Sequence, residues 1–275
     1  MIQLILFIII LFYLYFRYLI YVIDFFSGIL AAVVIWCNGF RMKVIDYNLK
    51  KVFPNMSDER RSEIKYKSLK ISFINLFLAL HQRLLLNNSL DYITNRFRSD
   101  GNFIDKKRIL ACAHLGILWH PVHYNKRYGS NSFMFKNNIK FLEKIFLPKK
   151  IFNSYEIYPC KNNEMSILKR STVNNFIIIC DQRGNSNELN FLNHKLKIFN
   201  SPSRLHYDLN IPLYCYFAIY NFKLKKIKEH IIKIKIDDND NVQSVTQKFA
   251  DIFTKFIFKY PEQYLWAHNI FRVKF

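Results

Sequence analysis

The chain is poor in glycine, and its cysteines form no close pairs. Only 6 of 275 residues are glycine, and no phosphate-cradling glycine loop is present, so a nucleotide-binding fold built on such a loop is not expected. The five cysteines form no C-x-x-C pair, which argues against a zinc site or a disulfide framework. We interpret them as buried free thiols in a reducing compartment; they are Cys37, Cys112, Cys160, Cys180 and Cys215.

Acidic residues are also scarce. There are 20 Asp and Glu against 41 Lys and Arg, and the net charge is +21. This balance predicts anionic partners, namely membrane head groups, phosphorylated lipids, acidic proteins or nucleic acid. Nucleic acid is not expected, because the sequence has no recognition helix, RNP-like aromatic motif or zinc finger. Apolar residues make up 51% of the chain, so core formation is not limited by lack of apolar surface.

The N-terminus is strongly apolar. The run from Ile2 to Ile23 is interrupted only by Gln3 and Arg17 and is long enough to span a bilayer. A second apolar stretch, 25–40, follows Asp24. It is consistent with a second membrane helix, an interfacial helix or the first helix of the globular part. A cleaved signal peptide is not expected, because the run is too long and no basic residue precedes it.

Basic residues follow this apolar block directly, at Arg41, Lys43, Lys50 and Lys51. The positive-inside rule then places the body of the protein in the cytoplasm. We therefore expect an N-terminal transmembrane or interfacial anchor over residues 1–40 and an α/β domain over residues 41–275.

Short apolar runs alternate with helical patterns in the rest of the chain. Strands are predicted over 108–113, 176–180, 211–220 and 230–236. Helices are predicted after a Ser57 N-cap and over 242–260, where Pro261 ends the second helix. Strands that alternate with helices are typical of an α/β sheet. Ligands of such sheets usually bind beyond the carboxyl ends of the strands.

Two polar segments stand at those strand ends. "HLGILWH" contains His114 and follows the first strand, and "DQRG" begins with Asp181 and follows the second. His114 is a candidate general base, and the alternative is a strand-end histidine bonded to backbone. A metal site made with His120 and His123 does not match common zinc spacings. Cys112 is a poor nucleophile, because an apolar strand raises a thiol pKa.

Asp181 and Arg183 form a second candidate, as a catalytic or substrate-binding pair. The alternative is an aspartate that caps a turn beside a solvated arginine. A third segment, "PEQYLWAH" over residues 261–268, places a polar pair between proline and aromatic residues. It is consistent either with a C-terminal packing element or with a part of the site.

Several segments together resemble the late acyltransferases of lipid A biosynthesis, the family of lauroyl and myristoyl transferases. "NLKKVFPNMSDERR" resembles the N-L-x3-F-P segment that follows the anchor of the family. "AHLGILWH" resembles its G-H-x-G-N-W-E motif, and "ICDQRG" resembles its strand followed by D-Q. "PEQYLWAH" closely resembles the P-E-Q-Y-x-W-x-H near its C-terminus. The similarity runs in order along nearly the whole chain.

The resemblance implies an α/β fold like that of glycerolipid acyltransferases, with a mixed sheet flanked by helices and an N-terminal membrane anchor helix. It implies a bacterial inner-membrane enzyme that takes an acyl chain from acyl carrier protein and gives it to a hydroxyl of a phosphorylated glycolipid. No cofactor or metal is implied. The anionic membrane surface is a further expected partner.

The same resemblance assigns roles to individual residues. His114 corresponds to the family base and Asp181 to the aspartate after the strand. Glu262, Gln263 and Trp266 correspond to the C-terminal motif, where a structural role is expected. Cations that are available for substrate phosphates are Arg183, Lys149, Lys150 and Arg170.

The chain departs from the family at one important place. The family has a carboxylate five residues after its histidine, which orients and charges that base. Here Trp119 stands at this position and His120 follows it. A one-residue insertion would align His120 with the carboxylate, but a histidine cannot orient a base as an anion does. Asp181 is an alternative orienter if the two strand ends lie close together. Otherwise the chain is a slow enzyme or a non-catalytic homologue that binds lipid or acyl carrier protein.

Overall fold

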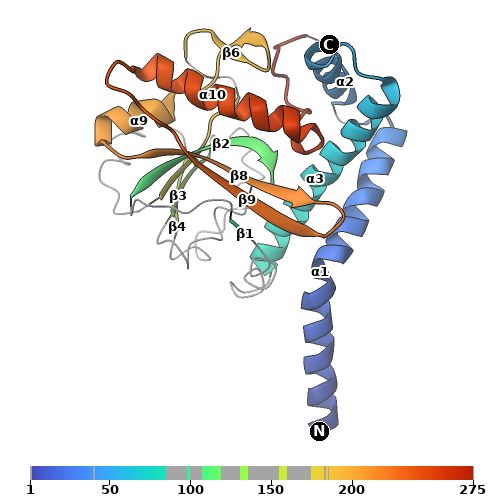
Figure 1. Cartoon of the computed structure of the whole chain (residues 1–275). Helices are drawn as coiled ribbons and strands as arrows, with labels where there is room; N and C mark the ends of the chain where they lie inside the picture. The colour runs from blue at the N-terminus through green and yellow to red at the C-terminus, as the bar shows by residue number, and fades with distance from the viewer. Residues whose placement is uncertain are drawn as a thin grey trace.

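The computed structural model contains one large sheet with helices on both faces and a long helix that projects from the body (Figure 1). The first strand in the chain to carry a predicted site residue is β2, Arg108–Gly116. The residues described are 2–39, 41–84, 98–99, 107–118, 131–135, 155–159, 175–182, 184 and 186–274.

The main sheet has seven strands in the order β1-β9-β8-β2-β5-β3-β4. Strand β8 runs antiparallel to β9, and all the other neighbours are parallel, so the sheet is mixed. A separate antiparallel pair is formed by β6 and β7. The remaining strands are β1 (Arg98–Ser99), β3 (Asn131–Phe135), β4 (Tyr155–Pro159), β5 (Asn175–Ile179), β6 (Leu189–Phe191), β7 (His194–Leu196), β8 (Leu213–Asn221) and β9 (Lys226–Lys233).

Both faces of the central strands are buried, as a near-continuous apolar sequence requires. In β2, Ile109, Ala111 and Ala113 belong to one core, and Leu110 and Cys112 belong to the other. The first core lies under α2 (Met42–Val52), α9 (Ser201–Leu209) and α10 (Val242–Lys259). The second core is covered by α1 (Ile2–Trp36) and α3 (Asp58–Leu84). Figure 1 shows α9 and α10 together on one side of the sheet.

Helix α1 is continuous through Asp24, so the two apolar stretches predicted from the sequence form one helix. Among the described residues, one helical segment is long and apolar enough to cross a membrane. It is Tyr18–Trp36, with a mean hydropathy of 2.2. The predicted start of the next long helix is confirmed, because the Arg60 amide donates to Ser57 Oγ at 3.3 Å and α3 begins at Asp58.

The α/β class and the mixed sheet are confirmed, and the four predicted strands correspond to β2, β5, β8 and β9. The last of them, β9, begins and ends earlier than the predicted 230–236. Its first half alternates the exposed Lys226 and Lys228 with the buried Ile227 and Glu229, and its pairing with β8 starts directly after a tight turn. Alternation of this kind marks a strand with one exposed face.

The cysteine prediction is correct in part. Cys112, Cys180 and Cys215 are buried free thiols, whereas Cys37 is exposed after the end of α1 and contradicts the prediction of burial. The apolar residues around Cys37 belong to a helix whose outer face is not covered by the rest of the described chain. Cys160 lies outside the described residues.

Candidate active site

Strand register brings His114 and Asp181 together. Strands β2 and β5 are parallel, with Cys112 opposite Ile179, and the ladder continues where the Cys180 amide donates to the Cys112 carbonyl at 2.9 Å. His114 and Asp181 each lie two residues beyond that pair, and alternate residues of parallel strands share a face. Their side chains meet, with His114 Nδ1 lying 2.7 Å from Asp181 Oδ1.

The C-terminal segment supplies the other partner of this carboxylate. The Tyr264 hydroxyl donates to Asp181 Oδ2 at 2.9 Å, and both side chains are buried. Tyr264 is held there by backbone pairing. It forms an isolated antiparallel bridge with Leu115, and the Leu265 amide donates to the His114 carbonyl at 2.9 Å. Both oxygens of Asp181 therefore have hydrogen-bond partners, and one of them comes from the far end of the chain.

The electrostatics of the site favour a charged carboxylate. Burial raises the pKa of Asp181, but the opposing charge of His114 and the hydrogen bonds from His114 and Tyr264 lower it, and the net pKa lies below its ordinary value. Burial and the Asp181 charge raise the pKa of the Tyr264 phenol and of the Cys112 thiol. The phenol therefore remains a donor at neutral pH, and the thiol remains protonated and unreactive.

His114 is the exposed member of the group. Its side chain is 20% exposed, whereas the Asp181 side chain is fully buried. The Gln182 amide nitrogen lies 3.0 Å from both nitrogens of the imidazole. With Nδ1–H facing Asp181, the lone pair lies on Nε2, where the Gln182 amide can donate to it; a bound hydroxyl takes the place of that amide.

Gly116 and Asn75 shape the end of β2. Gly116 has a φ of +73° and lies against β8, where an added Cβ would stand 2.1 Å from the Ala218 carbonyl oxygen. Only glycine fits a position that combines a positive φ with such a close backbone contact. Beyond it, Asn75 of α3 donates to the Gly116 carbonyl and accepts from the Leu118 amide, both at 2.9 Å. Helix α3 thus fixes the chain just after His114.

The C-terminal motif is built into the sheet. It begins with a short 3-10 helix, η1 (Pro261–Gln263), directly after α10. The Gln263 side chain accepts from the amide of Tyr220 and donates to its carbonyl, both at 2.8 Å, so that it pairs with β8 as a neighbouring strand would. The buried Trp266 indole donates to the Pro261 carbonyl at 2.7 Å. Glu262 is half-buried in η1.

The segment that resembles N-L-x3-F-P packs against this motif. Asn48 of α2 donates to the carbonyls of Trp266 and His268, at 2.7 and 2.6 Å. The Phe53 ring meets the Trp266 ring edge to face, with centroids 5.7 Å apart. Two segments near opposite ends of the chain thus support each other and hold Tyr264 beside Asp181. Gln263 and Trp266 make these contacts within the fold, and the structural role assigned to them stays a prediction.

The structure brings together only part of the predicted set. His114 and Asp181 meet, but several predicted site residues lie outside the described residues; they are His120, Arg183, Lys149, Lys150 and Arg170. Sequence reasoning did not assign Tyr264, Gln182 or Asn75 to the site. Tyr264 lies within the quoted C-terminal motif, and Gln182 directly follows Asp181, so a signal was available for both. Asn75 is one polar residue in an apolar stretch, and its sequence context gives little signal of a place in the site.

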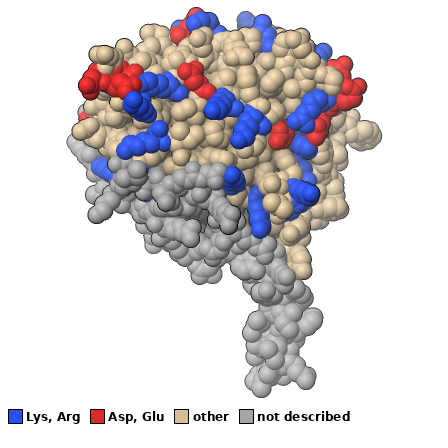
Figure 2. Space-filling view, in the orientation of Figure 1, with Lys and Arg blue, Asp and Glu red and all other residues tan. Residues whose placement is uncertain are grey.

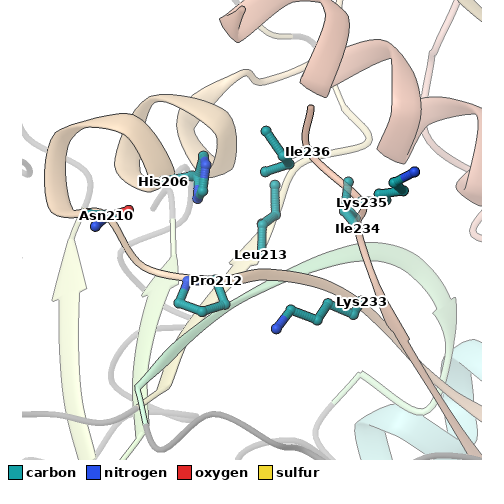
Figure 3. A pocket seen from close by; sticks show the side chains of 8 residues that line it. All are labelled: His206, Asn210, Pro212, Leu213, Lys233, Ile234, Lys235 and Ile236. Carbon is teal, nitrogen blue, oxygen red and sulfur yellow. The ribbon is translucent and has the colours of Figure 1, made fainter. Parts of the chain in front are cut away.

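A pocket of about 450 Å³ lies at the opposite edge of the sheet (Figure 3). Its lining comes from the end of α9, the start of β8 and the end of β9; the residues are His206, Asn210, Pro212, Leu213, Lys233, Ile234, Lys235 and Ile236. Leu213 pairs with Ile109, five residues before His114 on β2, a separation of roughly 16 Å along a strand. This pocket is therefore separate from the His114 site.

A partly exposed histidine with a buried carboxylate on one nitrogen, at the carboxyl edge of a mixed sheet, can act in general-base chemistry. With the long apolar helix, this arrangement defines a class of α/β proteins that carry a histidine–carboxylate pair at the carboxyl ends of the strands. The chain matches the family model for bacterial lipid A biosynthesis acyltransferase over residues 2–273. It belongs to this family of late lipid A acyltransferases, which confirms the resemblance found in the sequence.

Acyl transfer is the reaction of this family, and membership in it implies a glycolipid acceptor. Enzymes of lipid A biosynthesis are membrane associated in bacteria. A comparison with curated proteins gave no match.

Proposed function

We propose that this chain transfers a fatty acyl group from acyl carrier protein to a hydroxyl of a lipid A-type glycolipid, with His114 as the general base. The observation that carries the proposal is the contact of 2.7 Å between His114 Nδ1 and Asp181 Oδ1. A carboxylate on Nδ1 fixes the tautomer in which Nε2 carries the lone pair, and it stabilises the imidazolium that forms after proton transfer.

The reaction needs no covalent enzyme intermediate. His114 Nε2 takes the proton of the acceptor hydroxyl while the oxygen attacks the thioester carbon, which forms a C–O bond and a tetrahedral oxyanion. Collapse of this oxyanion breaks the C–S bond, and the leaving thiolate takes the proton back from the imidazolium. The buried Cys112 thiol has a raised pKa and is no competing nucleophile.

Asp181 takes the part of the carboxylate that is absent from "HLGILWH". In the family, a carboxylate within the same motif orients the catalytic histidine. Here His114 has Trp119 and His120 at the corresponding positions. The parallel register of β2 and β5 offers a substitute from another strand, and Tyr264 holds it in place. This substitution favours a catalytic protein over a non-catalytic homologue that binds lipid or acyl carrier protein.

The charge and the long apolar helix agree with the two substrates. A net charge of +21 suits an acidic carrier protein and a phosphorylated lipid. In our proposal, residues 1–40 anchor the chain in the bacterial inner membrane and residues 41–275 form the acyltransferase domain on the cytoplasmic side. The cations after the helix, beginning with Arg41 and Lys43, support this orientation.

The test is acyl transfer from acyl carrier protein to a tetra-acylated lipid A precursor, using the wild type and His114→Ala. Loss of a general base lowers the turnover roughly 10²- to 10⁴-fold. His206→Gln is the matched control, because it changes a histidine in the pocket at the other sheet edge, and it should leave turnover near that of the wild type. Equal product from His114→Ala and the wild type would refute the base assignment. No product from a folded wild type would favour the non-catalytic role.

A further inference from the structure

Helix α1 carries one buried acidic residue, Asp24, and three side chains from the body of the protein surround it. Its Oδ2 pairs with Lys70 Nζ of α3 at 2.9 Å and with Lys225 Nζ at 2.6 Å. Its Oδ1 accepts from the hydroxyl of Tyr220, near the end of β8, at 3.1 Å. A carboxylate in an apolar helix is stable only with such partners. Asp24 therefore clamps α1 to α3 and to the β8–β9 hairpin.

The turn of this hairpin, Asn221–Lys226, has a defined shape. Asn221 Oδ1 accepts from the amides of Lys223 and Leu224, at 3.0 and 2.8 Å, and its carbonyl accepts from the Lys225 amide at 2.8 Å. The turn presents Leu224, which is 56% exposed, between the exposed Lys223 and Lys226. An exposed apolar side chain flanked by lysines suits the surface of an anionic membrane.

The clamp places this turn at the level of the membrane surface. The sequence is apolar from Ile2 to Ile23 apart from Gln3 and Arg17. The end of this run, at Leu19, Ile20 and Ile23, is buried in the second core, so the part before it is the part that enters the hydrocarbon. Asp24 is the first acidic residue after this run. Because Lys225 contacts Asp24, the turn lies where α1 leaves the body of the protein, as Figure 1 shows.

The charges on the described surface agree with a bilayer on the side of the projecting helix. Figure 2 shows acidic side chains in the upper part of this face, whereas the described band nearest the projecting helix carries Lys and Arg without acids.

We propose that the β8–β9 turn is a second membrane contact, in which Leu224 enters the interface and Lys223 and Lys226 bind anionic lipid head groups. The Asp24 clamp joins this contact to the anchor helix. Because β8 also borders β2 at Gly116, the same contact holds the His114 edge of the sheet toward the membrane. A lipid acceptor could then reach that edge from the bilayer.

The experiment measures the depth of the turn in the full chain, in nanodiscs. Leu224→Cys is labelled with an environment-sensitive fluorophore after Cys37→Ser and Cys160→Ser, and nitroxide lipids serve as the quencher. Quenching should be stronger in discs that contain phosphatidylglycerol than in phosphatidylcholine alone. The pair Lys223→Gln and Lys226→Gln should weaken the insertion equilibrium roughly 25-fold, or about fivefold for each lysine. High salt should act in the same direction.

Two controls separate a specific contact from general proximity. A label at Asn239→Cys, in an exposed turn between β9 and α10, should show little quenching, and Lys195→Gln with Lys197→Gln should leave the Leu224→Cys signal unchanged. The proposal is overturned if both labels quench equally, if the lipid charge has no effect, or if the Lys223 and Lys226 changes have none. No step needs acyl transfer, so this result and that of the activity assay are independent.

Discussion

The two edges of the sheet differ in what they offer to a ligand. The amino edge has the pocket of about 450 Å³ with Lys233 and Lys235 in its lining, and its histidine, His206, donates from Nδ1 to the Ile211 carbonyl at 2.8 Å. At the carboxyl edge, Nδ1 of His114 faces the Asp181 carboxylate instead. A carbonyl can orient an imidazole, but only a carboxylate also stabilises its positive charge. The partner of a histidine, more than the size of a nearby cavity, therefore indicates its chemistry.

The largest expected effect comes from removing the charge that distinguishes the two edges. Asp181→Asn keeps the size and position of the side chain but no longer stabilises an imidazolium on His114. We expect the turnover to fall roughly 10²- to 10⁴-fold with little change in KM. Steady-state acyl transfer measures this, and the exposed Asp208→Asn on α9 serves as the control. Turnover within threefold of the wild type would contradict the assignment of the active site to the carboxyl edge of the sheet.

A smaller effect is expected from Tyr264→Phe, which removes one hydrogen bond to Asp181 without changing the ring. We expect turnover to fall roughly tenfold, because the carboxylate loses part of its orientation. The folded-state pKa of Asp181 lies below its ordinary value, so its contribution to stability is present above the unfolded pKa of about 3.9 and is lost as the pH falls through the folded value. The variant raises that folded pKa.

Acid unfolding should therefore begin at a higher pH in Tyr264→Phe than in the wild type. The difference in stability should be full near neutral pH and should disappear below both pKa values. Unfolding followed by tryptophan fluorescence as a function of pH measures this. The exposed Tyr207→Phe should change neither turnover nor the acid limb. Identical acid limbs for Tyr264→Phe and the wild type would mean that the phenol does not support the carboxylate.

The smallest effect is expected at the pocket. Lys233→Gln together with Lys235→Gln removes both cations from its lining, and acyl transfer should stay within roughly twofold, since the changes lie far from the reacting groups. Kinetics at varied concentrations of acyl carrier protein measure this. A large rise in KM for the carrier would reverse the comparison, because it would make the amino edge a substrate-binding surface.

Much of the fold could be predicted from the sequence, because long apolar patterns are strong signals. The helix over 242–260 has an apolar stripe and a following Pro261, and it was found almost to the residue. The runs at β2, β5 and β8 are buried on both faces and were equally clear. The short strands β6 and β7 and the start of β9 were not predicted, because short or half-exposed strands depend on their neighbours for stability.

The site was predictable in its position more than in its composition. His114 and Asp181 follow apolar strands, so their place at one sheet edge followed from the general rule for α/β sheets. Tyr264 was not assigned, because its contact with Asp181 depends on a C-terminal segment that pairs with β2 over a separation of 149 residues from Leu115. The C-terminal motif singles out the segment that contains Tyr264, but no local pattern shows which residue of another strand it contacts.

By itself, the sequence determined the apolar N-terminal helix, the excess of positive charge, the strand ends that carry His114 and Asp181, and the likeness to the acyltransferase family. These depend on composition and on local order along the chain. Only the tertiary structure decided that a carboxylate from β5 lies on His114 although "HLGILWH" contains none. The physical reason is strand register: parallel pairing of β2 with β5 sets both residues at the same level and on the same face, and this pairing is a property of the folded sheet.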